Sequence, residues 1–143
     1  MIIAIGSDHA GYEVKEKIKE HLLNDFSFKV NDMGAFSLNS VDYPEFGHKV
    51  GEEVSSGRAN RGVVVCGSGI GISIAANKIK GIRAALCTTV DHAILSRKHN
   101  DANILALGAR LTHIDDIYAM IKVWFNTDFE KGRHLDRINL IEL

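Results

Sequence analysis

Residues 63–72 read Val63-Val64-Val65-Cys66-Gly67-Ser68-Gly69-Ile70-Gly71-Ile72. The valines are β-branched and uniformly apolar, which makes them the clearest strand signal in the chain. Three glycines within five positions then indicate a loop, and the small residues up to Lys80 predict a helix that Gly81 caps. A strand, a tight loop and a helix in this order favour a parallel sheet.

The same alternation continues in both directions along the chain. Further strands are expected at residues 2–5, 28–33, 82–87 and 104–107, and further helices at residues 14–22, 43–56, 91–98 and 114–126. We therefore predict an α/β fold: a single-domain three-layer sandwich in which a five-stranded parallel sheet carries helices on both faces, as in Rossmann-like proteins. The domain is expected to cover residues 1–143, with the tail of residues 128–143 completing the site, a subunit interface or both.

Composition places the chain among ordinary globular proteins. Of its 143 residues, 45% are hydrophobic and 24% are charged, which excludes collagen-like, disordered and disulfide-stapled classes. A formal net charge of −1 argues against a dedicated binder of nucleic acids or membrane surfaces. Two cysteines fit a reducing compartment, and the N-terminus lacks the basic start of a secretory signal. We therefore expect a cytoplasmic protein without nucleic-acid or membrane partners.

Ligands of parallel α/β sheets collect at the carboxyl ends of the strands. In this chain those ends are Ser7-Asp8-His9, Cys66-Gly67-Ser68-Gly69, Thr88-Thr89 and Gly108-Ala109-Arg110. In the glycine loop, bare backbone N–H groups can turn toward one point, and the helix that follows adds the positive end of its dipole. An anion, or an oxygen that acquires negative charge, would be stabilised there.

Several familiar glycine loops are excluded by position. A Walker-type loop ends in Gly-Lys-Ser/Thr, which is missing here. Ile72 stands where a dinucleotide fingerprint requires its third glycine and where a C-x5-R phosphatase requires its arginine. A phospho-receiver would have an aspartate in place of Cys66. The loop is therefore either an anion hole or a device for tight packing of helix on sheet.

Cys66 is the only titratable side chain in the loop, so it is the candidate base for a proton transfer. A helix N-terminus favours a thiolate and burial among apolar groups disfavours it, and the sequence leaves this balance open. The alternative is that Cys66 is a small buried hydrophobe. Cys87, inside an apolar strand, is expected to be inert core.

Five motifs follow one another along the chain: Gly6-Ser7-Asp8-His9-Ala10-Gly11, Asp42-Tyr43-Pro44, Cys66-Gly67-Ser68-Gly69-Ile70-Gly71 with Ser73-Ile74-Ala75-Ala76-Asn77-Lys78, Ser96-Arg97-Lys98-His99-Asn100-Asp101, and Gly132-Arg133-His134. In this order and spacing they resemble the ribose-5-phosphate isomerase B family, which also holds galactose-6-phosphate isomerase subunits. The resemblance runs from residue 1 to about residue 137. It implies reversible isomerisation of ribose 5-phosphate and ribulose 5-phosphate through an enediolate, in the pentose phosphate pathway, without metal or organic cofactor.

The resemblance also implies roles for individual residues. Cys66 would be the base that moves a proton between C1 and C2, and His99 the acid that helps to open the furanose ring. The substrate contacts would be Asp8, His9, Tyr43, Asn100, the loop residues Gly67, Ser68, Gly69, Ile70 and Gly71, and the phosphate ligands Arg110, Arg133 and Arg137. Some relatives lack the cysteine and use a glutamate where Ile72 stands, so this chain resembles the cysteine branch.

Structural alternatives exist for some of these residues. Asp8 could cap the helix that follows it, and Tyr43 could simply pack beside Pro44. Arg133 and Arg137 are four positions apart, so on a helix they share a face that could grip one phosphate or merely be solvated.

His99 follows the fourth predicted helix and precedes the fifth strand, which places it near the amino edge of the sheet. The glycine loop lies at the opposite edge. We therefore expect His99 to reach the loop of a second subunit, in a homodimer or a dimer of dimers, as the resemblance also implies. The apolar chain end, Leu140-Ile141-Glu142-Leu143, is expected to pack on that partner.

Two rival functions are compatible with the sequence. The same chemistry could act on a hexose 6-phosphate such as allose or galactose 6-phosphate, because the motifs are shared and the length of the pocket is not readable. A non-catalytic sugar-phosphate or nucleotide sensor would also use the loop and the arginines, but it has no use for Cys66 or His99.

Overall fold

A computed structural model describes residues 1–143 and contains the predicted five-stranded sheet. Neighbouring strands are parallel throughout and lie in the order β2-β1-β3-β5-β4. The strands are β1 Ile2–Ser7, β2 Lys29–Asp32, β3 Arg61–Cys66, β4 Ala84–Leu86 and β5 Ile104–Gly108. The prediction of a Rossmann-like parallel sheet is confirmed.

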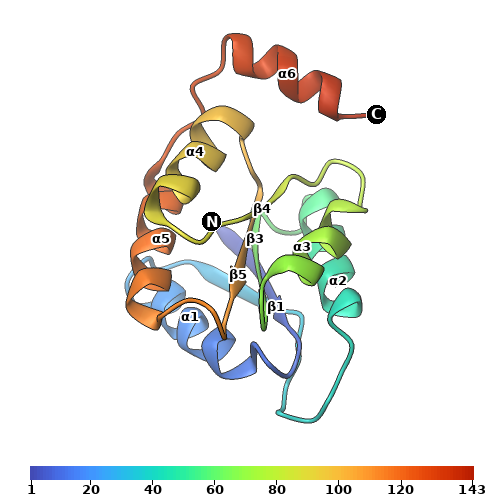
Figure 1. The fold of residues 1–143 in the computed structure, drawn as a ribbon, viewed down its shortest axis with the longest axis vertical. Helices are drawn as coiled ribbons and strands as arrows, with labels where there is room; N and C mark the ends of the chain where they lie inside the picture. The colour runs from blue at the N-terminus through green and yellow to red at the C-terminus, as the bar shows by residue number, and fades with distance from the viewer.

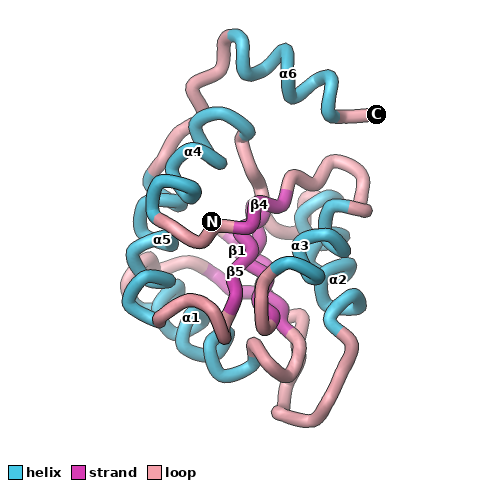
Figure 2. The backbone as a smooth tube through the Cα atoms, in the orientation of Figure 1, coloured by secondary structure: helices cyan, strands magenta, loops and turns pink.

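Helices cover both faces of the sheet (Figure 1). They are α1 Tyr12–Asn24, α2 Tyr43–Ser55, α3 Ile70–Asn77, α4 Val90–Asn100, α5 Ile114–Asn126 and α6 Arg133–Ile141. Helices α1, α4 and α5 pack on one face and α2 and α3 on the other, with the strands between them in Figure 2. None of the helices combines the length and the hydropathy that a membrane crossing requires.

The alternation of side chains along β3 builds two separate cores. Val63 and Val65 are fully buried in the cluster that includes Trp124 of α5, whereas Val64 and Cys66 belong to the cluster that includes Ile72 of α3. Because successive side chains of a strand point to opposite faces, an uninterrupted apolar run is required at this central position. Cys66 therefore points to the same side of the sheet as α2 and α3.

The register of the sheet brings three strand ends together at one edge. Ser7 at the end of β1 is opposite Val65, and Cys66 at the end of β3 is opposite Gly108 of β5. The loops after β1, β3 and β5 are consequently neighbours in space, although they lie far apart in the sequence.

The predicted end of helix α3 is wrong. Helix α3 ends at Asn77 and not at Lys80, so Gly81 is not its cap but part of the turn that leads into β4. The side chain of Asn77 accepts a hydrogen bond from Ala84 N–H over 2.8 Å and donates to Ala84 O over 2.9 Å. The Asn77 side chain thus pairs with the first residue of the edge strand β4, and the helix ends there.

Helix α6 stands apart from the rest of the molecule and packs beside α4 (Figure 1). Its buried residues are His134 and Ile138, whereas Leu135, Leu140 and Ile141 are exposed. An amphipathic helix with so much uncovered apolar surface is typical of a segment that contacts a partner.

Candidate active site

The glycine loop surrounds the thiol of Cys66 at the carboxyl end of β3. The N–H of Gly69 donates to Cys66 Sγ over 3.1 Å, and α3 begins at the next residue, Ile70. Gly69 has a φ of +78°, and a Cβ atom there would lie 2.6 Å from Leu86 Cδ1, so only glycine fits this turn. The loop thus directs a backbone amide toward the sulfur at the point where α3 begins.

The loop after β5 is held against the glycine loop. Arg110 N–H donates to Gly67 O over 2.9 Å, and a Cβ atom on Gly108 would lie only 2.5 Å from Ser68 O. The Arg110 side chain is exposed and lies alongside Gly67, with its Cδ 3.4 Å from where a Gly67 Cβ would stand. Its guanidinium is therefore available at the mouth of the loop to an anionic group.

The end of β1 contributes Asp8 and His9 to the same edge. Asp8 is buried, its N–H donates to Val65 O over 3.3 Å, and its Oδ1 accepts from Gly11 N–H over 3.0 Å. Asp8 thus holds the turn that leads into α1, but it does not cap that helix, whose N-cap is Gly11. His9 Nδ1 lies 3.2 Å from both the backbone N and the backbone O of Val41. His9 therefore ties this edge to the segment that precedes α2.

Tyr43 begins α2, and its ring lies against the first turn of α3. A Cβ atom on Gly71 would lie 2.5 Å from Tyr43 Cζ and 2.9 Å from the hydroxyl oxygen. Gly71 is therefore needed for the close approach of a ring and not for a turn. The Tyr43 side chain is exposed, so its hydroxyl remains accessible to a ligand.

The other predicted residues lie at the opposite edge of the sheet. His99 and Asn100 are the last residues of α4, which leads into the amino end of β5, and Arg133 and Arg137 are exposed on α6 (Figure 1). The His99 ring stacks on the ring of His134, with centroids 4.3 Å apart and planes 15° apart. One chain therefore keeps the Cys66 group and the His99 group at separate edges.

Residues 3–141 match the family model described as Ribose/Galactose Isomerase. The chain belongs to the ribose/galactose isomerase family. The family resemblance predicted from the five sequence motifs is thus confirmed.

Relatives of this family member match it over nearly its whole length. Ribose-5-phosphate isomerase B of Escherichia coli (strain K12) is 40% identical, with 97% of this chain and 93% of the relative covered. A galactose-6-phosphate isomerase subunit, LacB, of Clostridium acetobutylicum is 41% identical, with 96% of this chain and 79% of the relative covered. The solved structure of Clostridium thermocellum ribose-5-phosphate isomerase B has a TM-score of 0.96 at 50% identity. The match covers 99% of this chain and 95% of the chain in that structure.

Within this isomerase-family fold, a buried ion pair that the motifs did not reveal supports the Cys66 edge. Lys15 is fully buried and donates to the two carboxylate oxygens of Asp32 over 2.7 and 2.8 Å. Burial raises the pKa of the Asp32 carboxyl, but hydrogen bonds from Lys15 and Lys19 outweigh it and hold that pKa below its usual value. Asp32 Oδ1 also accepts from Gly34 N–H over 3.0 Å, which anchors the segment that carries the partner of His9.

The sequence did contain a signal for this pair. Lys15 occupies the apolar stripe of α1 together with Ile18 and Leu22, which are both fully buried. A lysine at such a position requires a partner, because an unpaired buried charge is costly. The pattern cannot name Asp32, which lies on another element.

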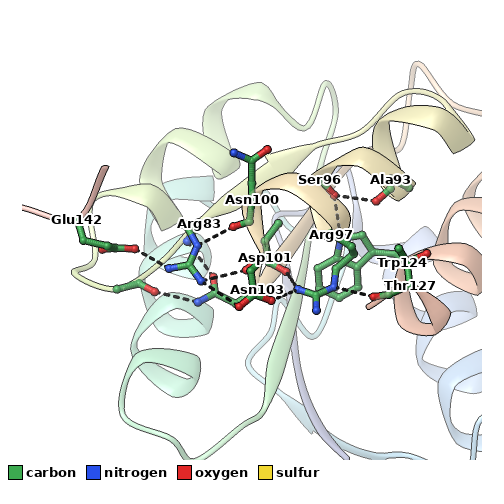
Figure 3. A network of polar contacts seen from close by, with 12 residues as sticks. Arg83, Ala93, Ser96, Arg97, Asn100, Asp101, Asn103, Trp124, Thr127 and Glu142 are labelled. Carbon is green, nitrogen blue, oxygen red and sulfur yellow. Dashed lines mark hydrogen bonds and ion pairs between the residues drawn. The ribbon is translucent and has the colours of Figure 1, made fainter. Parts of the chain in front are cut away.

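A second network holds the end of α4 on which His99 stands (Figure 3). Arg83 Nε donates to Asn100 O over 2.9 Å, and Arg97 Nη1 donates to Asp101 Oδ1 over 2.7 Å. Figure 3 shows the Asn100 side chain pointing away from Arg83, so the network uses the backbone of Asn100 and leaves its amide available.

Two further predictions concern residues near the loop. Cys87 is core, as predicted: it is 1% exposed, and burial raises the pKa of its thiol to about 11. It therefore stays protonated at neutral pH. Ile72 of α3 is fully buried in the core cluster on the side of α2 and α3.

Proposed function

We propose that this chain interconverts ribose 5-phosphate and ribulose 5-phosphate. The observation that carries the proposal is the Cys66 thiol inside the loop, with Gly69 N–H 3.1 Å from its sulfur. A relative of that activity, ribose-5-phosphate isomerase B of Escherichia coli, is 40% identical over 97% of the chain. The reaction moves hydrogen within one molecule and has no net oxidation, so it needs no redox cofactor.

In the proposed reaction Cys66 acts as the base on the open-chain sugar. The thiolate takes the proton from C2, the C–H electron pair forms the C1–C2 double bond, and the carbonyl oxygen at C1 gains the negative charge. The proton of the C2 hydroxyl then passes to the oxygen on C1, and the C2 carbonyl forms as the double-bond electron pair takes the proton back from the Cys66 thiol at C1, which gives the ketose. Amides of residues 67–71 stabilise the enediolate, and the loss of one such donor typically costs about 10²- to 10³-fold in rate.

The proposed site is completed by a second copy of the chain. His99 and Asn100 of that copy would face the Cys66 loop, where His99 protonates the ring oxygen as the furanose opens. Arg110 from the loop side and Arg133 and Arg137 from α6 would bind the phosphate through charge-assisted hydrogen bonds. This arrangement explains why the two groups of residues occupy opposite edges of one subunit.

A hexose 6-phosphate isomerase is the second candidate, because a galactose-6-phosphate isomerase subunit is as similar to this chain as the Escherichia coli enzyme is. We expect kcat/KM on ribose 5-phosphate to exceed that on allose or galactose 6-phosphate by at least about tenfold, the discrimination that a pocket achieves for a one-carbon difference. Coupled assays on the three sugars measure this. A hexose preference would replace the first proposal with the second, and absence of turnover on all three would favour a sensor.

The C-terminal tail provides a prediction about assembly. Leu140 is 81% exposed and Leu143 is fully exposed, while Arg83 Nη1 lies 2.5 Å from Glu142 Oε1 and anchors the end of the chain to the segment before β4. Truncation after Asn139 removes this apolar end and its anchor, and we expect it to shift the sedimentation profile toward smaller species. Asp136→Asn, on the exposed side of α6, serves as the control. An unchanged profile of the truncated chain would contradict a role of the tail in assembly.

A further inference from the structure

Three potential metal ligands converge between α4 and α6. They are His99, Glu130 and His134, and their ligand atoms all lie within 4.8 Å of one another. No spacing in the sequence signals this cluster, because 31 positions separate His99 from Glu130. The fold assembles it: Glu130 N–H donates to Lys98 O over 3.1 Å, which fixes the segment before α6 on the end of α4.

The donor atoms in this cluster are available to a ligand. Neither His99 nor His134 makes a hydrogen bond through its ring, although His134 is only 8% exposed. Glu130 directs its two oxygens to different neighbours: Oε2 lies 3.7 Å from His134 Nε2, and Oε1 lies 3.9 Å from Lys98 Nζ. One carboxylate oxygen therefore already faces an imidazole.

We propose that His99, Glu130 and His134 form a binding site for Zn²⁺. Two imidazoles and one carboxylate are a donor set that zinc accepts, with a fourth position left for water. A metal ion lies in the plane of each imidazole that binds it, whereas the two rings are now stacked 4.3 Å apart. Zinc binding therefore requires the stack to open by rotation of a ring, and the partly exposed His99 has the room for it.

The consequence for activity rests on the proposed function, in which His99 is the acid for ring opening. An imidazole nitrogen that binds zinc cannot donate a proton. The site thus makes the enzyme sensitive to inhibition by zinc, although the reaction itself uses no metal. Removal of zinc by a chelator restores the activity, because zinc binding leaves the covalent structure of the protein unchanged.

Calorimetric titration of the intact protein with ZnCl₂ tests the site directly. Wild type is expected to bind one Zn²⁺ per chain, and Glu130→Gln and His134→Asn are each expected to weaken binding by at least about tenfold, since changes around the ligands alone cost 10- to 100-fold. The matched control is His113→Asn, because His113 Nδ1 also lies near a carboxylate oxygen, 3.6 Å from Asp115, but has no second histidine. Thermal melts check that each variant is folded.

Two other patterns of zinc affinity would contradict the proposed zinc site. Equal zinc affinity in wild type and Glu130→Gln, or an affinity that falls only in Cys66→Ser, would assign the metal to other ligands. For turnover, Glu130→Gln should keep its basal rate and lose its sensitivity to zinc. If no sugar phosphate is turned over, the proposed function fails, whereas the calorimetry still decides the zinc site.

Discussion

Replacement of Cys66 by alanine is expected to lower kcat on ribose 5-phosphate by about 10²- to 10⁴-fold, the contribution that a positioned general base typically makes. The thiol is the titratable group inside the glycine loop, and the N–H of Gly69 points at its sulfur. Substrate affinity should change by no more than a few-fold, because loop amides and arginines bind the ligand without the sulfur. Steady-state kinetics and calorimetry with substrate measure the two quantities.

The chain offers a matched control in its second cysteine. Cys87→Ala removes a buried thiol of the same size, and because burial raises the pKa of Cys87 to about 11, that thiol is not a base at neutral pH. This variant should lose some stability and keep its kcat. Unchanged turnover in Cys66→Ala would refute the thiolate mechanism, and retained binding without any wild-type turnover would identify a sensor.

Mixing two inactive variants is expected to restore activity. Cys66→Ala lacks the proposed base and His99→Asn the proposed acid, so each homodimer alone has no complete site. After dissociation and reassembly of an equal mixture, activity should return to about a quarter of the wild-type value, because about half of the dimers are mixed and each of these keeps one intact site. The assay is turnover of ribose 5-phosphate against time of mixing.

The outcome depends on whether sites are shared between subunits. If base and acid came from one chain, the mixture would stay as inactive as its components. A mixture of Cys66→Ala with wild type controls for simple exchange of subunits, and sedimentation shows whether the mixed species form. Persistent inactivity with proven exchange would contradict the shared site.

Local patterns in the sequence were sufficient to predict most of the fold. The apolar run at residues 63–65 predicted a strand, and β3 is that strand, buried on both faces. The end of α3 was mispredicted because the partner of Asn77 is Ala84, across a turn, and side-chain pairing with an edge strand leaves no periodic signal. Lys15 was overlooked for a similar reason, since its partner Asp32 lies on another element.

The amino-acid sequence was sufficient to predict the sheet, the loop around Cys66 and the family, because strand and helix periodicity and short motifs are local properties of the chain. Which side chains meet became known from the three-dimensional packing. Parallel packing brings the ends of β1, β3 and β5 to one edge, whereas the end of α4 and α6 bring His99, Glu130 and His134 together at the other. Contacts of this kind depend on strand register and on helix packing, and both are defined only once the whole core has folded.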